Sequence, residues 1–219
     1  MLQKEQTAQV LERLREAYPD ARPGLNFSTP FELLIATILS AQCTDVRVNK
    51  VTPALFAAYP TAPAMNECPL ETLSEYIRTC GMYKTKAQNI KKTCAILTEK
   101  YGGEVPADRE ALESLPGVGR KTASVVLSNA FDIPAIAVDT HVFRVSNRIG
   151  LAEAPNVEKT ERQLMAQIPR DTWSIAHHWL IWHGRRVCSA RNPACQTCTL
   201  RDLCQDYQKR HGADKPEEK

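Results

Sequence analysis

The chain has 219 residues, of which 43% are hydrophobic, so it is long enough to bury a substantial core as one large domain or two small ones. Its formal net charge of +3 excludes a uniformly basic surface, so any contact with nucleic acid must come from a local patch. The longest apolar stretch, 31–41, is too short to cross a bilayer. The first residues include several charged side chains in place of the apolar run of a signal peptide. These features predict a globular cytoplasmic protein without a membrane anchor.

Nearly every segment shows a helical pattern, and no stretch has the pattern of a strand. Thr29-Pro30-Phe31-Glu32 is a capping box before a run that is apolar on all sides, so that helix should be buried. Thr52-Pro53 should kink or restart the helix that contains it. The expected helices cover 3–18, 30–41, 45–59, 70–80, 85–101, 108–115, 120–131, 140–149, 157–168 and 172–183. The sequence therefore predicts an all-α fold, with a disordered polar end at 212–219.

Two of these helices meet at the turn Pro116-Gly117-Val118-Gly119. Gly117 and Gly119 can both adopt a positive φ and carry no side chain that would block a close approach. A ligand against this turn would face free N–H groups and the positive end of the second helix. The turn is therefore a candidate anion site that suits a phosphate.

Lys121 lies in the first turn of that second helix, where the dipole disfavours a cation and should make some neutral, nucleophilic amine available. Asp139 begins the next helix and could return beside Lys121. A solvated lysine and an ordinary aspartate N-cap are the alternatives. A nucleotide-binding P-loop does not fit, because it requires glycine directly before the lysine and a strand upstream, whereas Arg120 and a helix stand there.

Four cysteines crowd the C-terminal segment with the spacing Cys-x6-Cys-x2-Cys-x5-Cys: Cys188, Cys195, Cys198 and Cys204. Nothing indicates a secreted protein, so a metal is favoured over disulfides. Structural zinc usually uses two close cysteine pairs, and only one is present here, whereas a compact four-cysteine loop also suits a cubane cluster. The spacing alone leaves iron–sulfur and zinc open. The other four cysteines are expected to be reduced and mostly buried: Cys43, Cys68, Cys80 and Cys94.

The segments 115–122 and 138–141, taken with the four-cysteine loop, resemble endonuclease III, a family of bacterial DNA glycosylase/lyases. The stretches 31–36, 39–42, 44–46 and 177–180 fit as well, and the resemblance covers about 11–204. It implies the helix–hairpin–helix DNA glycosylase fold, with two helical domains and a cleft between them. A six-helix domain would cover 22–131, and an iron–sulfur domain would combine 1–21 with 132–211.

The resemblance also implies an activity and a cofactor. A monomer would remove oxidised pyrimidines such as thymine glycol from duplex DNA, and its four C-terminal cysteines would hold one 4Fe-4S cluster. Lys121 would attack C1′ of the deoxyribose, while Asp139 would stabilise positive charge on the sugar and help deprotonate Lys121. The resulting Schiff base would permit β-elimination of the 3′ phosphate.

Contacts with DNA are expected from several further residues. Gln42 would fill the gap left by the rotated nucleotide, and Met82 occupies the place where relatives usually carry a leucine wedge. The hairpin would contribute Gly117, Val118, Gly119 and Arg120, and His141 is a candidate polar contact near Asp139. The last candidates are three arginines that flank the first cysteines: Arg185, Arg186 and Arg191. Two alternatives stay open. One is an adenine-mismatch glycosylase, which belongs to a branch that lacks the lysine, and the other is a non-catalytic DNA-binding module.

Overall fold

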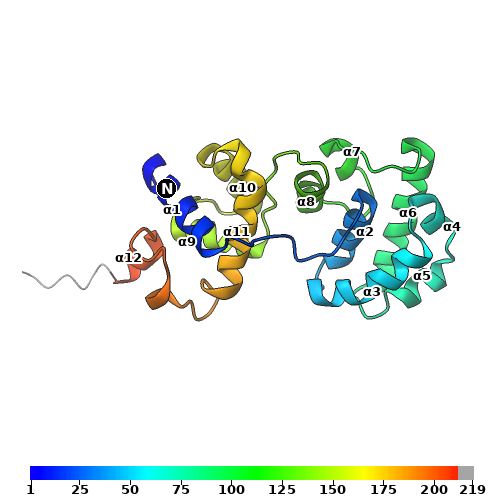
Figure 1. Cartoon of the computed structure of the whole chain (residues 1–219), viewed down its shortest axis with the longest axis horizontal. Coiled ribbons are helices and arrows are strands. Elements are labelled where there is room, and N and C mark those ends of the chain that lie inside the picture. The colour runs from blue at the N-terminus through cyan, green and yellow to red at the C-terminus, as the bar shows by residue number, and fades with distance from the viewer. Residues whose placement is uncertain (212–219) are drawn as a thin grey trace, which may run out of the picture. The chain divides into compact units, whose positions relative to one another are not determined.

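The structure, a computed structural model, describes residues 1–211, and every regular element in that range is helical (Figure 1). The all-α prediction is therefore confirmed for the described chain. The chain divides into two compact units: a middle unit, Pro23–Ile133, and a terminal unit, which combines Met1–Arg22 with Pro134–Lys219. None of the described helices has the length and apolar character needed to span a membrane. The expectation of disorder at 212–219 lies outside the described residues.

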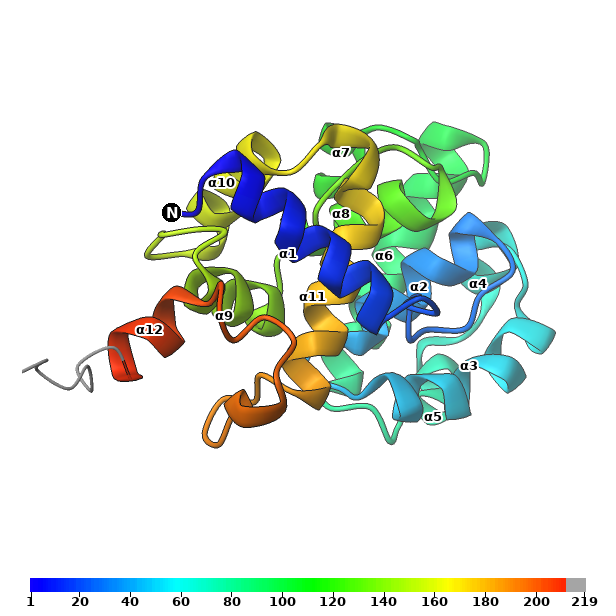
Figure 2. The same cartoon turned by 60° about the vertical axis from the view of Figure 1, so that its left-hand side comes forward.

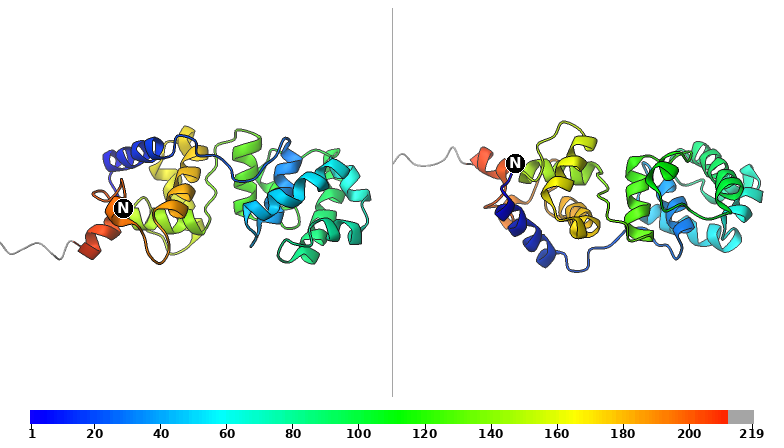
Figure 3. Two further views of the ribbon diagram at one scale, coloured as in Figure 1. Left: turned by 60° about the horizontal axis from the view of Figure 1, so that its bottom comes forward. Right: turned by 90° about the horizontal axis from the view of Figure 1, so that it is seen from above.

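The middle unit is built around one buried helix. Its helices are α2 (Pro30–Ser40), α3 (Asp45–Ala58), α4 (Ala62–Glu67), α5 (Leu70–Tyr76), α6 (Tyr83–Tyr101), α7 (Arg109–Glu113) and α8 (Arg120–Ala130). As expected from its apolar sequence, α2 is mostly buried, because it packs against three other helices, α3, α6 and α8 (Figure 3). Thr29 Oγ1 accepts the Glu32 N–H at 3.1 Å, while Glu32 Oε2 accepts the N–H of Ser28 at 2.6 Å, one residue earlier than a capping box predicts.

The structure refines the local predictions for the middle unit at three points. Of the two alternatives at Pro53, the restart is excluded, because α3 continues through this residue while the buried side chains of Leu55 and Phe56 hold the segment against the core. The helix expected over 70–80 ends at Tyr76 and continues as turns to Cys80, whose N–H bonds Ile77 O at 2.8 Å. The six-residue α4 was not predicted, since it is too short to show a helical period.

The terminal unit joins the two ends of the chain. Its helices are α1 (Lys4–Ala17), α9 (Thr140–Ile149), α10 (Val157–Gln167), α11 (Trp173–Arg186) and α12 (Gln205–His211), with 3₁₀ turns at Arg170–Thr172 and Cys195–Thr197. The helix α11 packs against α9 and α1 (Figure 2), and Leu14, Val142 and Leu180 are fully buried among them. The helix α11 extends three residues beyond the predicted end, so Arg185 and Arg186 form its last turn.

Candidate active site

The turn between α7 and α8 is fixed by α6. Gly117 has a φ of 80°, and a Cβ atom at this position would lie 3.0 Å from Asn89 Nδ2. Thr93 Oγ1 donates to the carbonyl of Pro116 at 2.9 Å. Val118 is only 5% exposed, so its side chain packs inside the turn. Glycine is required at position 117 by both its backbone conformation and its packing.

Gly119 does not use the positive φ that glycine permits. Its φ is −98° and its ψ is 179°, an extended conformation that any residue adopts, so a positive φ is not the reason for glycine here. A Cβ atom at Gly119 would meet nothing within 4 Å. The glycine instead leaves open space in front of α8, whose N-terminus no side chain caps. The first N–H groups of a helix have no partner within it, so this end can accept an anion that approaches over Gly119.

Lys121 lies in the first turn of α8, as the sequence predicts, and its side chain is exposed. Asp139 is the N-cap of α9, where its Oδ1 accepts the N–H groups of His141 and Val142, both at 2.8 Å. Both bonds use the same oxygen, and no group in residues 1–211 bonds Oδ2. Asp139 thus serves as a cap and still has an oxygen for a second role. Lys121 belongs to the middle unit and Asp139 to the terminal unit.

Gln42 and Met82 share an unusual backbone conformation. Their φ angles are 52° and 55°, in the left-handed region that residues with a side chain rarely adopt. Gln42 follows α2 and Met82 is the N-cap of α6, and both side chains are exposed. A Cβ atom on Gly81 would lie 3.3 Å from the Gln42 carbonyl oxygen, so the two loops touch. Strained backbone concentrates at functional sites, which supports a role for this pair.

Arg144 connects the start of α9 with the cysteine segment, a link that the sequence did not reveal. Its Nη2 lies 3.1 Å from His141 Nδ1 and donates to Gly184 O at 3.0 Å, while its Nε donates to Cys188 O at 3.1 Å. Burial lowers the pKa of His141; Asp139 acts in the opposite sense, and Arg144 lowers it further. The only signal in the sequence was an arginine on the inner face of an amphipathic helix, which is uncommon.

The four C-terminal cysteines line a common cavity. Several N–H groups point at their sulfurs. Arg148 Nη1 lies 3.5 Å from Cys188 Sγ, Arg210 Nη2 lies 3.7 Å from Cys195 Sγ, and the Leu200 N–H lies 3.4 Å from Cys198 Sγ. Donors around sulfur stabilise thiolates, the form that binds metals.

The donor set of this cavity suits an iron–sulfur cluster. Four thiolates are the usual ligands of a 4Fe-4S cluster, in which each cysteine binds a different iron. The residues that would hold it are Cys188, Cys195, Cys198 and Cys204.

Three arginines next to the cysteines form an exposed group that we call the basic patch: Arg185, Arg186 and Arg191. The guanidinium of Arg186 stacks on the ring of Trp182, with Cζ 4.0 Å from the ring centroid. Stacking orients a guanidinium while its N–H groups remain able to bind a phosphate. Arg191 lies in the loop that leads from Cys188 to Cys195.

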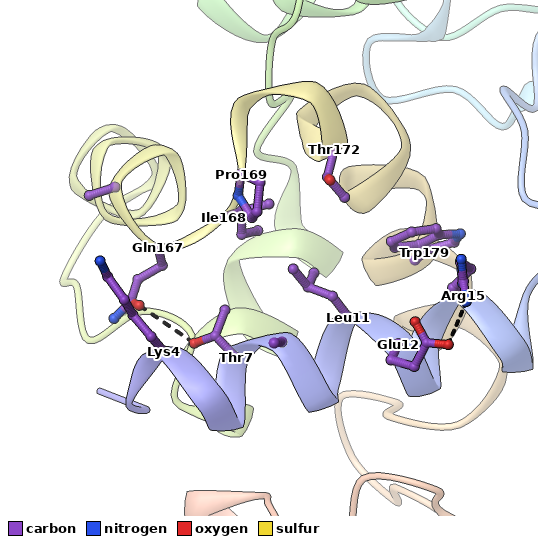
Figure 4. Close-up of a pocket in the computed structure, with 12 residues that line it drawn as sticks. Lys4, Thr7, Leu11, Glu12, Arg15, Gln167, Ile168, Pro169, Thr172 and Trp179 are labelled. Atoms are coloured by element: carbon purple, nitrogen blue, oxygen red, sulfur yellow. Dashed lines mark hydrogen bonds and ion pairs between the residues drawn. The ribbon is translucent and has the colours of Figure 1, made fainter.

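A hollow of about 550 Å³ lies between α1 and the connection from α10 to α11 (Figure 4). An ion pair from Arg15 to Glu12 at 2.5 Å lies at one end, and Thr7 Oγ1 lies 3.5 Å from Gln167 Oε1 at the other. None of the site residues predicted from the sequence lines it. This hollow is therefore separate from the candidate site.

Known proteins match the chain along most of its length. Residues 35–170 match the HhH-GPD superfamily of base excision DNA repair proteins, and residues 188–204 match the iron–sulfur binding domain of endonuclease III. Endonuclease III of Escherichia coli (strain K12) is 53% identical over 208 residues, which are 95% of this chain and 99% of the relative. Endonuclease III of Bacillus subtilis (strain 168) is 48% identical over 211 residues, 96% of either chain.

Solved structures agree with these matches. A trapped covalent intermediate of endonuclease III with DNA has a TM-score of 0.91 at 52% identity, covering 96% of this chain and 99% of the other. A thermostable thymine-DNA glycosylase has a TM-score of 0.83 at 24% identity, covers 94% and 98% of the two chains, and thus shares the fold. This chain therefore belongs to the endonuclease III family within the HhH-GPD superfamily of base excision DNA repair proteins, and it carries that family's iron–sulfur binding domain.

Proposed function

We propose that this protein removes oxidised pyrimidines from duplex DNA in the cytoplasm and then cleaves the strand at the abasic site. The observation that carries the proposal is the exposed amine of Lys121, which lies in the first turn of an uncapped helix, directly after a turn that can hold a phosphate. A related endonuclease III forms a covalent intermediate with DNA, which a nucleophile of this kind would explain for that protein. The protein acts as a monomer on double-stranded DNA.

DNA recognition begins with the backbone. The N–H groups at Gly119 and the start of α8 hold a phosphate near the lesion, while the basic patch contacts phosphates elsewhere along the strand. A base inside the duplex hides its glycosidic bond, so the nucleotide must rotate out of the stack. Gln42 then fills the vacated position and Met82 enters the stack from the neighbouring loop, because both are exposed and held in fixed backbone conformations.

The proposed chemistry uses Lys121 and Asp139. The Lys121 amine forms a bond to C1′ as the glycosidic bond breaks and its electrons leave with the base. The Oδ2 of Asp139 stabilises the positive charge that develops on the sugar, and the carboxylate helps to remove a proton from the amine. The sugar ring opens to a Schiff base on Lys121 Nζ, which acidifies the C2′ proton. Loss of that proton breaks the bond from C3′ to its oxygen and releases the 3′ phosphate.

We assign 22–131 to one helical domain and 1–21 with 132–211 to the other, and the compact unit Pro23–Ile133 supports this assignment. The four C-terminal cysteines hold one 4Fe-4S cluster, which when bound supplies a fixed centre for the loop that carries Arg191. Arg144 and Arg148 join this loop to α9, since they donate to carbonyls of Cys188 and Ser189 at 3.1 and 2.7 Å. The residues of the loop thereby support the helix that Asp139 begins.

Borohydride trapping on a duplex with one abasic site tests the proposal, because reduction of a Schiff base joins the protein permanently to DNA. The wild-type protein should be trapped, and Lys121→Gln should lose trapping and strand cleavage while its affinity for abasic DNA remains. Trapping by Lys121→Gln would place the nucleophile elsewhere. Binding of damaged duplexes without trapping or excision by the wild type would favour a non-catalytic module, and excision without trapping would favour a glycosylase that lacks lyase activity.

A further inference from the structure

Two cysteines outside the cluster segment lie under the loops that carry Gln42 and Met82. Cys43 directly follows Gln42, and Cys80 precedes Met82 by two residues. A Cβ atom on Gly81 would lie 3.3 Å from the Gln42 carbonyl oxygen, and the Cys43 thiol helps to raise the pKa of Cys80, as a close neighbour does. The chain therefore brings together two thiols that are far apart in sequence, at the point where these two loops meet.

A buried lysine holds this junction together. The Nζ of Lys86, from the first turns of α6, donates to the carbonyl of Leu39 near the C-terminal end of α2 at 2.8 Å. Lys86 is only 3% exposed, and it interacts electrostatically with both Cys43 and Cys80. Burial has the largest effect on the pKa of Cys80, which it raises, and the Lys86 ammonium opposes this rise. The Lys86 side chain therefore lies near both thiols while it joins α6 to the end of α2.

The two thiols differ in accessibility. Cys43 is partly exposed, whereas Cys80 is 1% exposed, and burial raises the pKa of Cys80 to about 11, with a further increase from the Cys43 thiol. Cys43 is therefore the thiol that a dissolved oxidant reaches first, and Cys80 is placed to react with it afterwards. The remaining cysteines of the middle unit, Cys68 and Cys94, are buried and are not paired in this way.

We propose that Cys43 and Cys80 form a reversible disulfide, made by exchange with a small-molecule disulfide, which joins the Gln42 loop to the Met82 loop. The Cys43 thiolate attacks one sulfur of the small disulfide, forms a mixed disulfide and releases the first small thiol. The Cys80 thiolate then attacks the sulfur of Cys43 and releases the second. Two protein thiols are oxidised, one small disulfide is reduced, and the two protons end on the two small thiols.

The disulfide should weaken binding to DNA with a displaced nucleotide. Gln42 and Met82 have to enter the duplex from their two loops, and a covalent bond between the adjacent residues restricts how far these loops can separate. This consequence rests on the proposed function, whereas the formation of the bond does not. The disulfide is therefore a modification that couples the redox state of the surroundings to recognition of the lesion.

The test incubates the whole protein without oxygen in oxidised or reduced glutathione and follows two readouts. Peptide mapping by mass spectrometry should find the peptides of Cys43 and Cys80 joined only after oxidation. Affinity for a duplex with a reduced abasic-site analogue should then be roughly tenfold lower than in the reduced protein, and dithiothreitol should restore it. Visible absorbance of the cluster is recorded throughout, so that damage to the cluster is recognised.

Three variants separate the proposal from other effects. Cys43→Ser and Cys80→Ser should bind as the reduced wild type does in both conditions, whereas Cys94→Ala should respond like the wild type. If Cys80→Ser does not fold, Cys43→Ser is sufficient, because its side chain is partly exposed. Absence of the joined peptide overturns the proposal, and a joined peptide with unchanged affinity overturns the effect of the disulfide on recognition. Failure of the reduced wild type to bind damaged DNA would instead count against the proposed function.

Discussion

Replacement of Asp139 by asparagine and by alanine separates its two roles, because its two backbone bonds both use Oδ1. Asparagine keeps an oxygen that can accept these bonds and loses only the favourable interaction of a charge with the helix dipole, about 0.3–1 kcal/mol. Alanine loses the cap, at a cost of about 0.5–2 kcal/mol. For a chain of this size each kcal/mol lowers the melting temperature by about 2–4 °C. Asp139→Ala should therefore melt a few degrees below Asp139→Asn, which should melt close to the wild type.

Activity should follow a different order from stability. Both variants lack the carboxylate that stabilises positive charge on the sugar, so base excision should fall by about 10²–10³-fold in each. The assay is single-turnover excision on a duplex with one thymine glycol, with thermal melting of the same samples. Near wild-type excision by Asp139→Asn would show that Asp139 is only a cap. Excision rates that decrease in step with the melting temperatures would show that the loss arises from the fold.

Three further outcomes are expected. Protein isolated without added metal should contain about four iron atoms per chain and little zinc, and stoichiometric zinc would contradict the cluster. Cys198→Ala should lose the iron and melt at a lower temperature, because cluster binding is coupled to folding. Replacement of the three arginines of the basic patch by alanine should weaken binding to damaged and undamaged DNA alike. The slope of the logarithm of the binding constant against the logarithm of the salt concentration should become less steep by about one unit per lost phosphate contact. An unchanged slope would mean that these arginines are only solvated. Gly117→Ala should destabilise the protein by about 1 kcal/mol or more, since its φ is 80°, while Gly119→Ala should fold normally and bind DNA more weakly; equal melting temperatures would refute this distinction.

The sequence predicted the elements whose causes are local. Neighbouring residues determine where α8 starts and where Lys121 lies in it, and the structure has α8 where it was expected. The spacing of the four C-terminal cysteines is likewise read from one short segment. The sequence could not tell which of the two glycines uses a positive φ, because glycine permits this conformation without requiring it: Gly117 has it and Gly119 does not. The left-handed conformations of Gln42 and Met82 could not be predicted, since they arise where two distant loops touch. The bonds of Arg144 to a segment 40 residues and more away were missed for the same reason.

The terminal unit is built from segments at both ends of the sequence, and this determines when it can fold during synthesis. The helix α1 is made before the middle unit, yet Tyr18 bonds His183 at 2.9 Å across 165 residues and Thr7 lies beside Gln167 across 160. The apolar face of α1 consequently has no partner until α11 has been made, while the middle unit already holds all of its own helices. The middle unit can therefore fold before the terminal unit, which closes through contacts of high sequence separation that form slowly. During that interval α1 is the exposed apolar segment that chaperones would engage.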